Sequence, residues 1–103
     1  MAKILSVTTS RVRDGKQADY LAAMAKLKAF VEGNGATMRV LQQTYGGNPL
    51  TITTVIECPD WAAFGAFSAK LEKDSGVQAL LAQLRANPVS DIIARGVSTE
   101  VDV

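Results

Sequence analysis

The segment ATMRVLQQTYGGNPLTITTVIEC, residues 36–58, is the part of the chain that decides the fold. Its two halves, 36–45 and 50–58, are rich in the β-branched and apolar residues that favour strands. Between them lies GGNP (46–49), in which the glycines tolerate a positive φ and the proline starts a new segment. The segment therefore predicts a β-hairpin of two antiparallel strands.

Helical patterns stand on both sides of this hairpin. Upstream, a capping-box pattern that starts at Asp14 precedes an apolar stripe with helical spacing. The stripe consists of Tyr20, Met24, Leu27 and Val31. Downstream, Asp60 is the expected N-cap of a helix that has Trp61 on its inner side. The sequence SGVQ (75–78) repeats the capping-box pattern and predicts the start of a further short helix.

Strands are expected at the two ends of the chain. The stretch KILSVTTSRV (3–12) has the alternation of a strand, and VSDIIARGVSTEVDV (89–103) reads as a long final strand with a bulge at Gly96. The predicted order is β-α-β-β-α-β, which is the ferredoxin-like arrangement of the α+β class. We expect one domain over residues 1–103, with helices covering one face of an antiparallel sheet.

Composition excludes several classes of function. The net charge of +1, from 11 basic and 10 acidic residues, gives no electrostatic case for binding nucleic acid or an anionic membrane. An RNA-binding domain of this topology is also disfavoured, because the first and third strands carry no aromatic residue for stacking on bases. No run approaches the ~20 apolar residues of a membrane span, and no secretion signal is evident, so the expected location is the cytoplasm.

The residue types that most often bind metals are scarce. Histidine is absent, which removes the commonest metal ligand and the usual general base near neutral pH. The single cysteine excludes an internal disulfide and makes a zinc site implausible. We therefore expect neither a metal nor a cofactor.

The second face of the sheet has no helix to cover it. Its expected residues are Ser6, Thr8, Ser10, Thr51, Thr53, Val55 and Glu57, joined by Arg39 and Arg95. Two interpretations suit this semi-polar set: a solvated sheet, or a sheet that packs on a second copy around a partly polar cavity. In VSTEVDV (97–103), β-branched residues alternate with polar ones. This pattern favours packing on a second copy, because an unpaired β-branched edge strand invites association. We expect a homodimer held by the sheet faces and the C-terminal strand, with a small-molecule ligand.

Three stretches carry a resemblance to a known group of proteins. They are VRDGKQADYLAAMAKL (12–27), VIECPDWAAFGAFSAKL (55–71) and DSGVQALLAQL (74–84). Their order and spacing resemble the dimeric α/β-barrel superfamily, and within it the NIPSNAP-like and antibiotic-biosynthesis-monooxygenase-like small proteins. The resemblance implies two sheets that form a barrel across a dimer, with a small-molecule pocket inside the barrel or between each sheet and its helices.

The superfamily includes many functions. Many members are cofactor-free oxygenases, isomerases or decarboxylating enzymes, and many have no known activity. This chain lacks histidine, so the histidine base or haem ligand of some members cannot be carried over to it.

Individual residues keep alternative interpretations. Glu57 is expected either to form a salt bridge with Arg39 or Arg95 at the strand end, or to act as a general base whose pKa is raised by burial. Tyr45 is either a packing residue at the hairpin end or a hydrogen-bond donor to a ligand. Cys58 has the strand parity of the helix-facing side, which favours a small buried hydrophobic residue over a nucleophile. For Trp61 we expect packing in the core or at a dimer contact.

Two functions follow from these candidates. The first is a cofactor-independent oxygenase or isomerase, in which Glu57 or Tyr45 acts as acid or base and an arginine stabilises an enolate or phenolate. The expected ligand contacts are Arg39, Arg95, Thr8 and Thr53. The alternative is a non-catalytic homodimeric module for binding or interaction.

Overall fold

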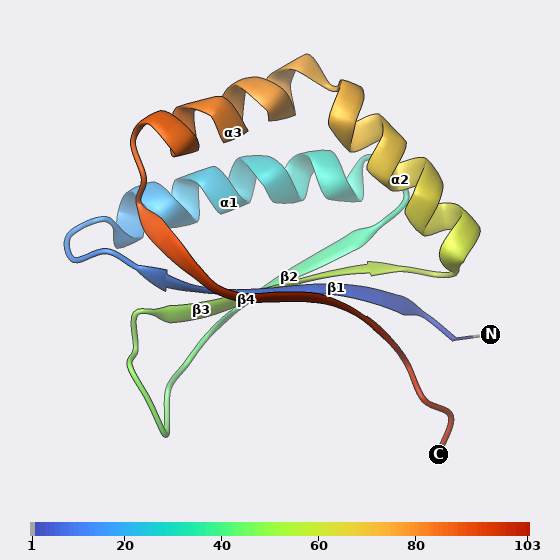
Figure 1. Cartoon of the computed structure of the whole chain (residues 1–103), viewed down its shortest axis with the longest axis horizontal. Coiled ribbons are helices and arrows are strands. Elements are labelled where there is room, and N and C mark those ends of the chain that lie inside the picture. Colours follow the sequence, from blue (N-terminus) through green and yellow to red (C-terminus); the bar gives the residue numbers. More distant parts are fainter. Residues whose placement is uncertain (1) are drawn as a thin grey trace.

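The computed structural model describes residues 2–103, so Met1 of the expected domain lies outside the described residues. The elements are β1 (Ile4–Val12), α1 (Gln17–Glu32), β2 (Thr37–Gln42), β3 (Thr51–Cys58), α2 (Trp61–Lys73), α3 (Ser75–Ala86) and β4 (Ser90–Thr99). The strands form one antiparallel sheet in the order β2-β3-β1-β4, and all three helices lie on one side of it (Figure 1). The predicted ferredoxin-like arrangement is confirmed, with the second helical region divided into α2 and α3.

Aspartates set the starts of the two later helices. Asp60 caps α2 as predicted, because its carboxylate accepts a hydrogen bond of 2.7 Å from the backbone N–H of Ala63. For α3 the prediction is wrong by one residue: Asp74, rather than Ser75, accepts from the N–H of Val77 at 2.9 Å. Asp74 has an extended backbone, so it both ends α2 and starts α3.

The start of α1 differs from the prediction. Its N-cap position is Lys16, and no side chain caps it, so the expected capping role of Asp14 is wrong. Asp14 and Gly15 instead form a turn, which Gly15 permits with a φ of +76°. The N–H of Lys16 closes this turn by donating to the carbonyl of Arg13 at 3.0 Å.

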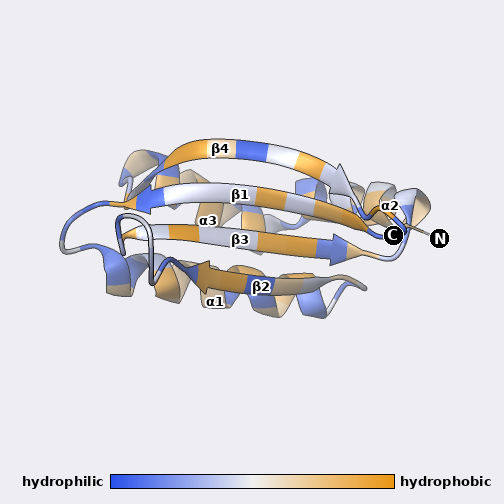
Figure 2. Ribbon diagram, turned by 90° about the horizontal axis from the view of Figure 1, so that it is seen from below, coloured by the Kyte–Doolittle hydropathy of each residue, from blue (hydrophilic) through white to orange (hydrophobic). Residues whose placement is uncertain are grey.

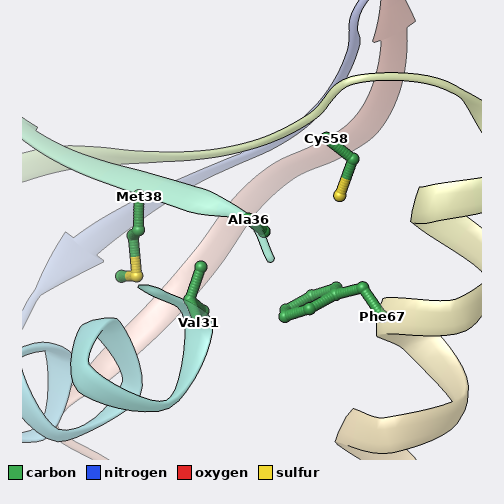
Figure 3. Packing of buried hydrophobic residues seen from close by; sticks show 5 residues of the cluster. All are labelled: Val31, Ala36, Met38, Cys58 and Phe67. Carbon is green, nitrogen blue, oxygen red and sulfur yellow. The ribbon is translucent and has the colours of Figure 1, made fainter. Parts of the chain in front are cut away.

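The core lies between the sheet and the helices in two clusters. The larger joins the end of α1, the paired ends of β2 and β3, and the middle of α2. Its buried members are Val31, Ala36, Met38, Cys58 and Phe67 (Figure 3). Cys58 is 0% exposed on the helix side of β3, which confirms its predicted orientation. The smaller cluster contains Val12, Tyr20 and Ile52 at the other end of the sheet.

Trp61 does not join either cluster. The first residue of α2 is 60% exposed, and its ring meets the ring of Phe64 edge-on at 5.8 Å. The expectation that Trp61 packs in the core is therefore wrong for the single chain, whereas Ala63 and Phe64 of the same turn pack against the larger cluster.

The register of β1 corrects a further expectation. In the β1–β3 ladder Leu5 lies opposite Glu57 and Val7 lies opposite Val55, so these four residues share one face. Ser6, Thr8 and Ser10 have the opposite parity and lie on the helix face. All three were expected on the uncovered face. The expectation followed the apolar character of Leu5 and Val7, but the buried ends of β1 are Ile4 and Val12, which have the opposite parity.

The bulge in the final strand is also displaced from its predicted position. The register between β1 and β4 shifts between Thr9 and Ser10, which pair with Ala94 and Ile92, so Ile93 is the extra residue. Gly96 pairs regularly with Val7. The strand ends at Thr99 rather than Val103, although the N–H of the next residue still donates to the carbonyl of Lys3 at 3.0 Å.

Candidate functional site

The sheet face opposite the helices, here called the open face, is the larger of two candidate surfaces. It consists of Leu5, Val7, Thr9 and Arg11 of β1, Thr51, Thr53, Val55 and Glu57 of β3, Thr37, Arg39 and Leu41 of β2, and Asp91, Ala94, Gly96 and Ser98 of β4. Figure 2 looks onto this face, where hydrophobic and hydrophilic segments alternate along the strands and no helix lies in front of the sheet. Its centre is apolar and its two ends carry charges.

Glu57 forms the charged group at one end of the open face. Its carboxylate lies 3.7 Å from Nη2 of Arg39 and 3.5 Å from Nζ of Lys3. The predicted pairing of Glu57 with Arg39 is confirmed, while Arg95 lies on the other face of the sheet. Lys3 was missed by sequence reasoning, although its spacing of two residues from Leu5 gives it the same parity. One carboxylate thus meets two cations.

Threonines stand between this group and the opposite end of the face. Thr53 lies directly across from Thr9, and their hydroxyl oxygens are 3.3 Å apart. Thr9 is a second residue that sequence reasoning did not place on this face. The pair leaves hydroxyl groups next to the apolar centre formed by Val7 and Val55. A ligand or a partner could use these hydroxyls as donors or acceptors.

Tyr45 lies apart from the other candidates. It is 90% exposed in the connection between β2 and β3, which bends towards the side of the open face (Figure 1). An open depression of about 380 Å³ lies beside it, lined by Leu41, Gln42, Gln43, Thr44, Tyr45 and Thr53. Because Tyr45 packs on little of its own chain, the expectation that it is a packing residue at the hairpin end is wrong for the isolated protomer.

The second candidate surface lies on the helix side of β1 and β4. Thr8 and Arg95 are opposite each other there, and the flanking Ile92 and Val97 are 57% and 49% exposed. The sheet contacts of α1 and α2 are mainly with β2 and β3, so the helices leave this half of the sheet without close cover. The structure thus brings Thr8 opposite Arg95 on the helix side. Thr53 and Arg39 lie on the open face instead, where Thr53 is opposite Leu41 and Arg39 is opposite Val55.

Cys58 has the environment of an inert thiol. Burial raises the pKa of this thiol, and the nearby carboxylates of Asp60 and Glu57 raise it further because they repel a thiolate. The cysteine therefore remains protonated near neutral pH. Within residues 2–103, no three side chains of the His, Cys, Asp or Glu types gather in a way that could hold a metal ion. Over the same residues, no helix combines the length and apolarity needed to span a bilayer.

Comparison with known proteins gives matches at the level of structure. No family model and no curated protein matches the sequence. A variant of SnoaB, a cofactor-independent oxygenase from Streptomyces nogalater, superposes with a TM-score of 0.74 at 19% identity, over 98% of this chain and 95% of that one. A dimeric ferredoxin-like protein from an uncultured marine organism also gives 0.74, at 18% identity over 100% and 99% of the two chains.

A third solved structure extends the group. It is an uncharacterized NIPSNAP domain protein from Burkholderia xenovorans, with a TM-score of 0.70 at 16% identity over 97% of this chain and 94% of that one. This chain has their ferredoxin-like fold. The fold is also that of proteins resembling the antibiotic biosynthesis monooxygenases, as the sequence resemblance predicted. At such low identities the likeness establishes the ferredoxin-like fold and leaves the chemistry to the residues of this chain.

Proposed function

We propose that this single-domain protein is a homodimer that binds a small organic molecule on the helix side of its sheet. The observation that carries the proposal is the pairing of Arg95 with Thr8 next to exposed Ile92 and Val97. A cation and a hydroxyl set among apolar side chains provide orientation and hydrophobic contact together, which is the usual make-up of a small-molecule site. The chemistry suits an aromatic or otherwise apolar ligand that carries an anionic oxygen.

The open face supports the homodimer. It has an apolar centre at Val7 and Val55 and charged groups at its ends, around Glu57 and around Asp91. Interfaces between proteins have this pattern of an apolar core within a polar rim. The C-terminal tail (100–103) bends towards the same side (Figure 1) and is proposed to contact the partner. One solved structure of this fold is itself described as dimeric.

Cofactor-independent oxygenation or isomerisation is the proposed activity class. SnoaB, which shares the fold, is described as a cofactor-independent oxygenase. In such chemistry Arg95 would stabilise an enolate or phenolate by its charge, and Thr8 would fix the orientation of the ligand. The planar guanidinium of Arg95 presents several N–H donors, so it can hold an oxyanion by paired hydrogen bonds.

A non-catalytic binding module is the alternative, and one observation favours it. Neither candidate base lies near Arg95, because Glu57 is on the open face in an ion pair and Tyr45 is on the exposed hairpin. A ligand at Arg95 that must lose a proton would need another base. The alternative keeps the same site and dimer and omits the reaction.

The site can be tested with 1-anilinonaphthalene-8-sulfonate, an aromatic anion whose fluorescence rises in apolar surroundings. Arg95→Ala should weaken its binding, whereas Arg85→Ala on the outer part of α3 should leave binding unchanged. Equal binding by the Arg95→Ala and wild-type proteins would overturn the site. Oxygen consumption with a bound hydroxyaromatic compound, lost in Arg95→Ala, supports the enzyme. Binding without turnover supports the module.

A further inference from the structure

A groove lies in the helical layer, apart from both candidate surfaces. It runs between α1 and α3, which point in opposite directions (Figure 1), and has a volume of about 600 Å³. Its apolar lining includes Ala22 and Ala23 of α1 and Leu80 and Leu84 of α3. The alanines keep the groove open, because their methyl groups cannot span the space between the two helices. Its volume is within the range of small-molecule sites, roughly 300–1,000 Å³.

Charged residues border this apolar lining along α1. Lys16 and Lys26 both line the groove, with Asp19 between them. Their ten-residue separation corresponds to about 15 Å along the helix axis. None of the three takes part in a salt bridge with any of residues 2–103. Two cations against one anion leave the groove with an uncompensated positive charge.

The Lys16 end of the groove offers the stronger attraction for an anion. Lys16 stands at the start of α1, where no side chain caps the backbone N–H groups of the first turn. The amide of Asn87 and the link to β4 border the same end. A carboxylate at this end would be attracted by the ammonium group and by the positive end of the helix dipole. The apolar part of the same molecule would then lie over the alanines and leucines.

We propose that the α1–α3 groove binds an aliphatic carboxylate, with the carboxylate at Lys16 and the chain directed towards Lys26. This site is distinct from the surface at Arg95. The groove lies between α1 and α3, whereas the Arg95 surface lies on the helix-facing side of the sheet. The ligand class is an anionic amphiphile with a narrow apolar chain, because the groove is long and bordered by two lysines.

The proposal is tested by NMR titration of the full-length protein with decanoate, below the concentration at which it forms micelles. The amide signals of Ala22, Ala23, Leu80 and Leu84 should shift together and saturate. Decylamine has the same chain with a positive head and should shift them weakly or not at all. Equal binding of decylamine and decanoate would overturn the carboxylate assignment, and shifts centred elsewhere would overturn the groove.

Matched variants separate the groove from general surface effects. Ala22→Trp fills the groove and should abolish saturable decanoate binding, whereas Ala25→Trp, at an exposed position of α1 outside the groove lining, should retain it. Lys16→Ala should weaken binding about two- to fivefold, as expected for a partly solvated ion pair. Lys28→Ala is the charge control and should have no effect. Unweakened binding by the Ala22→Trp protein contradicts the proposal.

A last variant keeps this inference separate from the proposed function. Arg95→Ala should leave decanoate binding unchanged, because Arg95 does not line the groove. If Arg95→Ala abolished the decanoate shifts, the ligand would belong to the helix-side surface of the sheet and the groove assignment would fail. If it instead abolished only the binding of the aromatic sulfonate, both assignments would stand.

Discussion

Val7 is the position at which the proposed dimer can be disrupted with the least effect on the protomer. It lies at the centre of the open face, opposite Val55 on β3 and Gly96 on β4. No charged residue pairs with it directly, and the cation in the same row, Arg39, stands one strand further away and already pairs with Glu57. In a single protomer the Val7→Asp side chain would point to solvent. In a dimer formed through the open face it would be buried.

The magnitude follows from desolvation. A stable interface buries about 800 Å² per partner, and its centre excludes water. Burying an unpaired carboxylate costs several kcal/mol, and the two-fold symmetry of a homodimer introduces the substitution twice. A total cost of at least about 3 kcal/mol would raise the dissociation constant more than roughly a hundredfold.

Sedimentation equilibrium at micromolar concentration measures this effect. The wild-type protein should be dimeric, and Val7→Asp should be monomeric with an unchanged circular dichroism spectrum. Val7→Thr keeps the side-chain shape and should remain dimeric, and Leu21→Asp, on the exposed side of α1, is the charge control. A monomeric wild type, or a Val7→Asp protein that dimerises as tightly as the wild type, would refute the assignment of the open face.

Three further predictions concern the protomer. Cys58→Ser should lower the free energy of unfolding by about 1–3 kcal/mol, because the hydroxyl is buried among apolar groups. Native Cys58 should react slowly with a disulfide reagent, and rapid labelling would contradict its burial. Arg13 donates hydrogen bonds of 2.9 and 3.2 Å to Asp91 and holds the pKa of that carboxyl below its ordinary value. The stabilisation from this pair is therefore present above the ordinary pKa and is lost as pH falls through the lowered one. The loss in melting temperature on acidification should be smaller in Arg13→Ala than in the wild type, and an equal loss would argue against this contribution. Asp60→Ala removes the cap of α2 and should cost about 1 kcal/mol in urea unfolding, whereas Asp14→Ala, which removes no cap, should cost little.

Much of the fold could be predicted because local patterns agree with the tertiary arrangement. The hairpin turn, the β-branched strands around it and the apolar stripe that ends at Val31 each specify their element without distant contacts. The parity of β3 also fixed Cys58 towards the helices and Glu57 away from them. These parities predicted an ion pair of Glu57 with Arg39 or Arg95, and the register of the strands selected Arg39.

The faces of β1 could not be predicted from its own sequence. Leu5 and Val7 resemble core residues, and Thr8 resembles a surface residue, yet the ladder with β3 places Thr8 on the helix side. A strand that alternates weakly polar and apolar residues has two plausible orientations, which differ by a single step in register. Burial of Ile4 and Val12 at the two ends of β1 sets the orientation of the strand.

The separation of the candidate ligand contacts also depended on the tertiary structure. Thr8 and Arg95 meet across β1 and β4, while Thr53 and Arg39 lie on the opposite face. The register of β4 is shifted by the extra residue Ile93, and a bulge of this kind is set by twist and packing that a linear pattern does not record.

The sequence by itself determined the order of the elements, the antiparallel hairpin and the presence of one sheet face that no helix covers. These follow from spacing and residue type within short segments. Only the tertiary structure decided which face each residue of β1 and β4 occupies, and that alanines leave a groove between α1 and α3. The physical reason is that side-chain direction in a strand follows from its ladder with neighbours, and the space between two helices follows from how far apart the rest of the fold holds them.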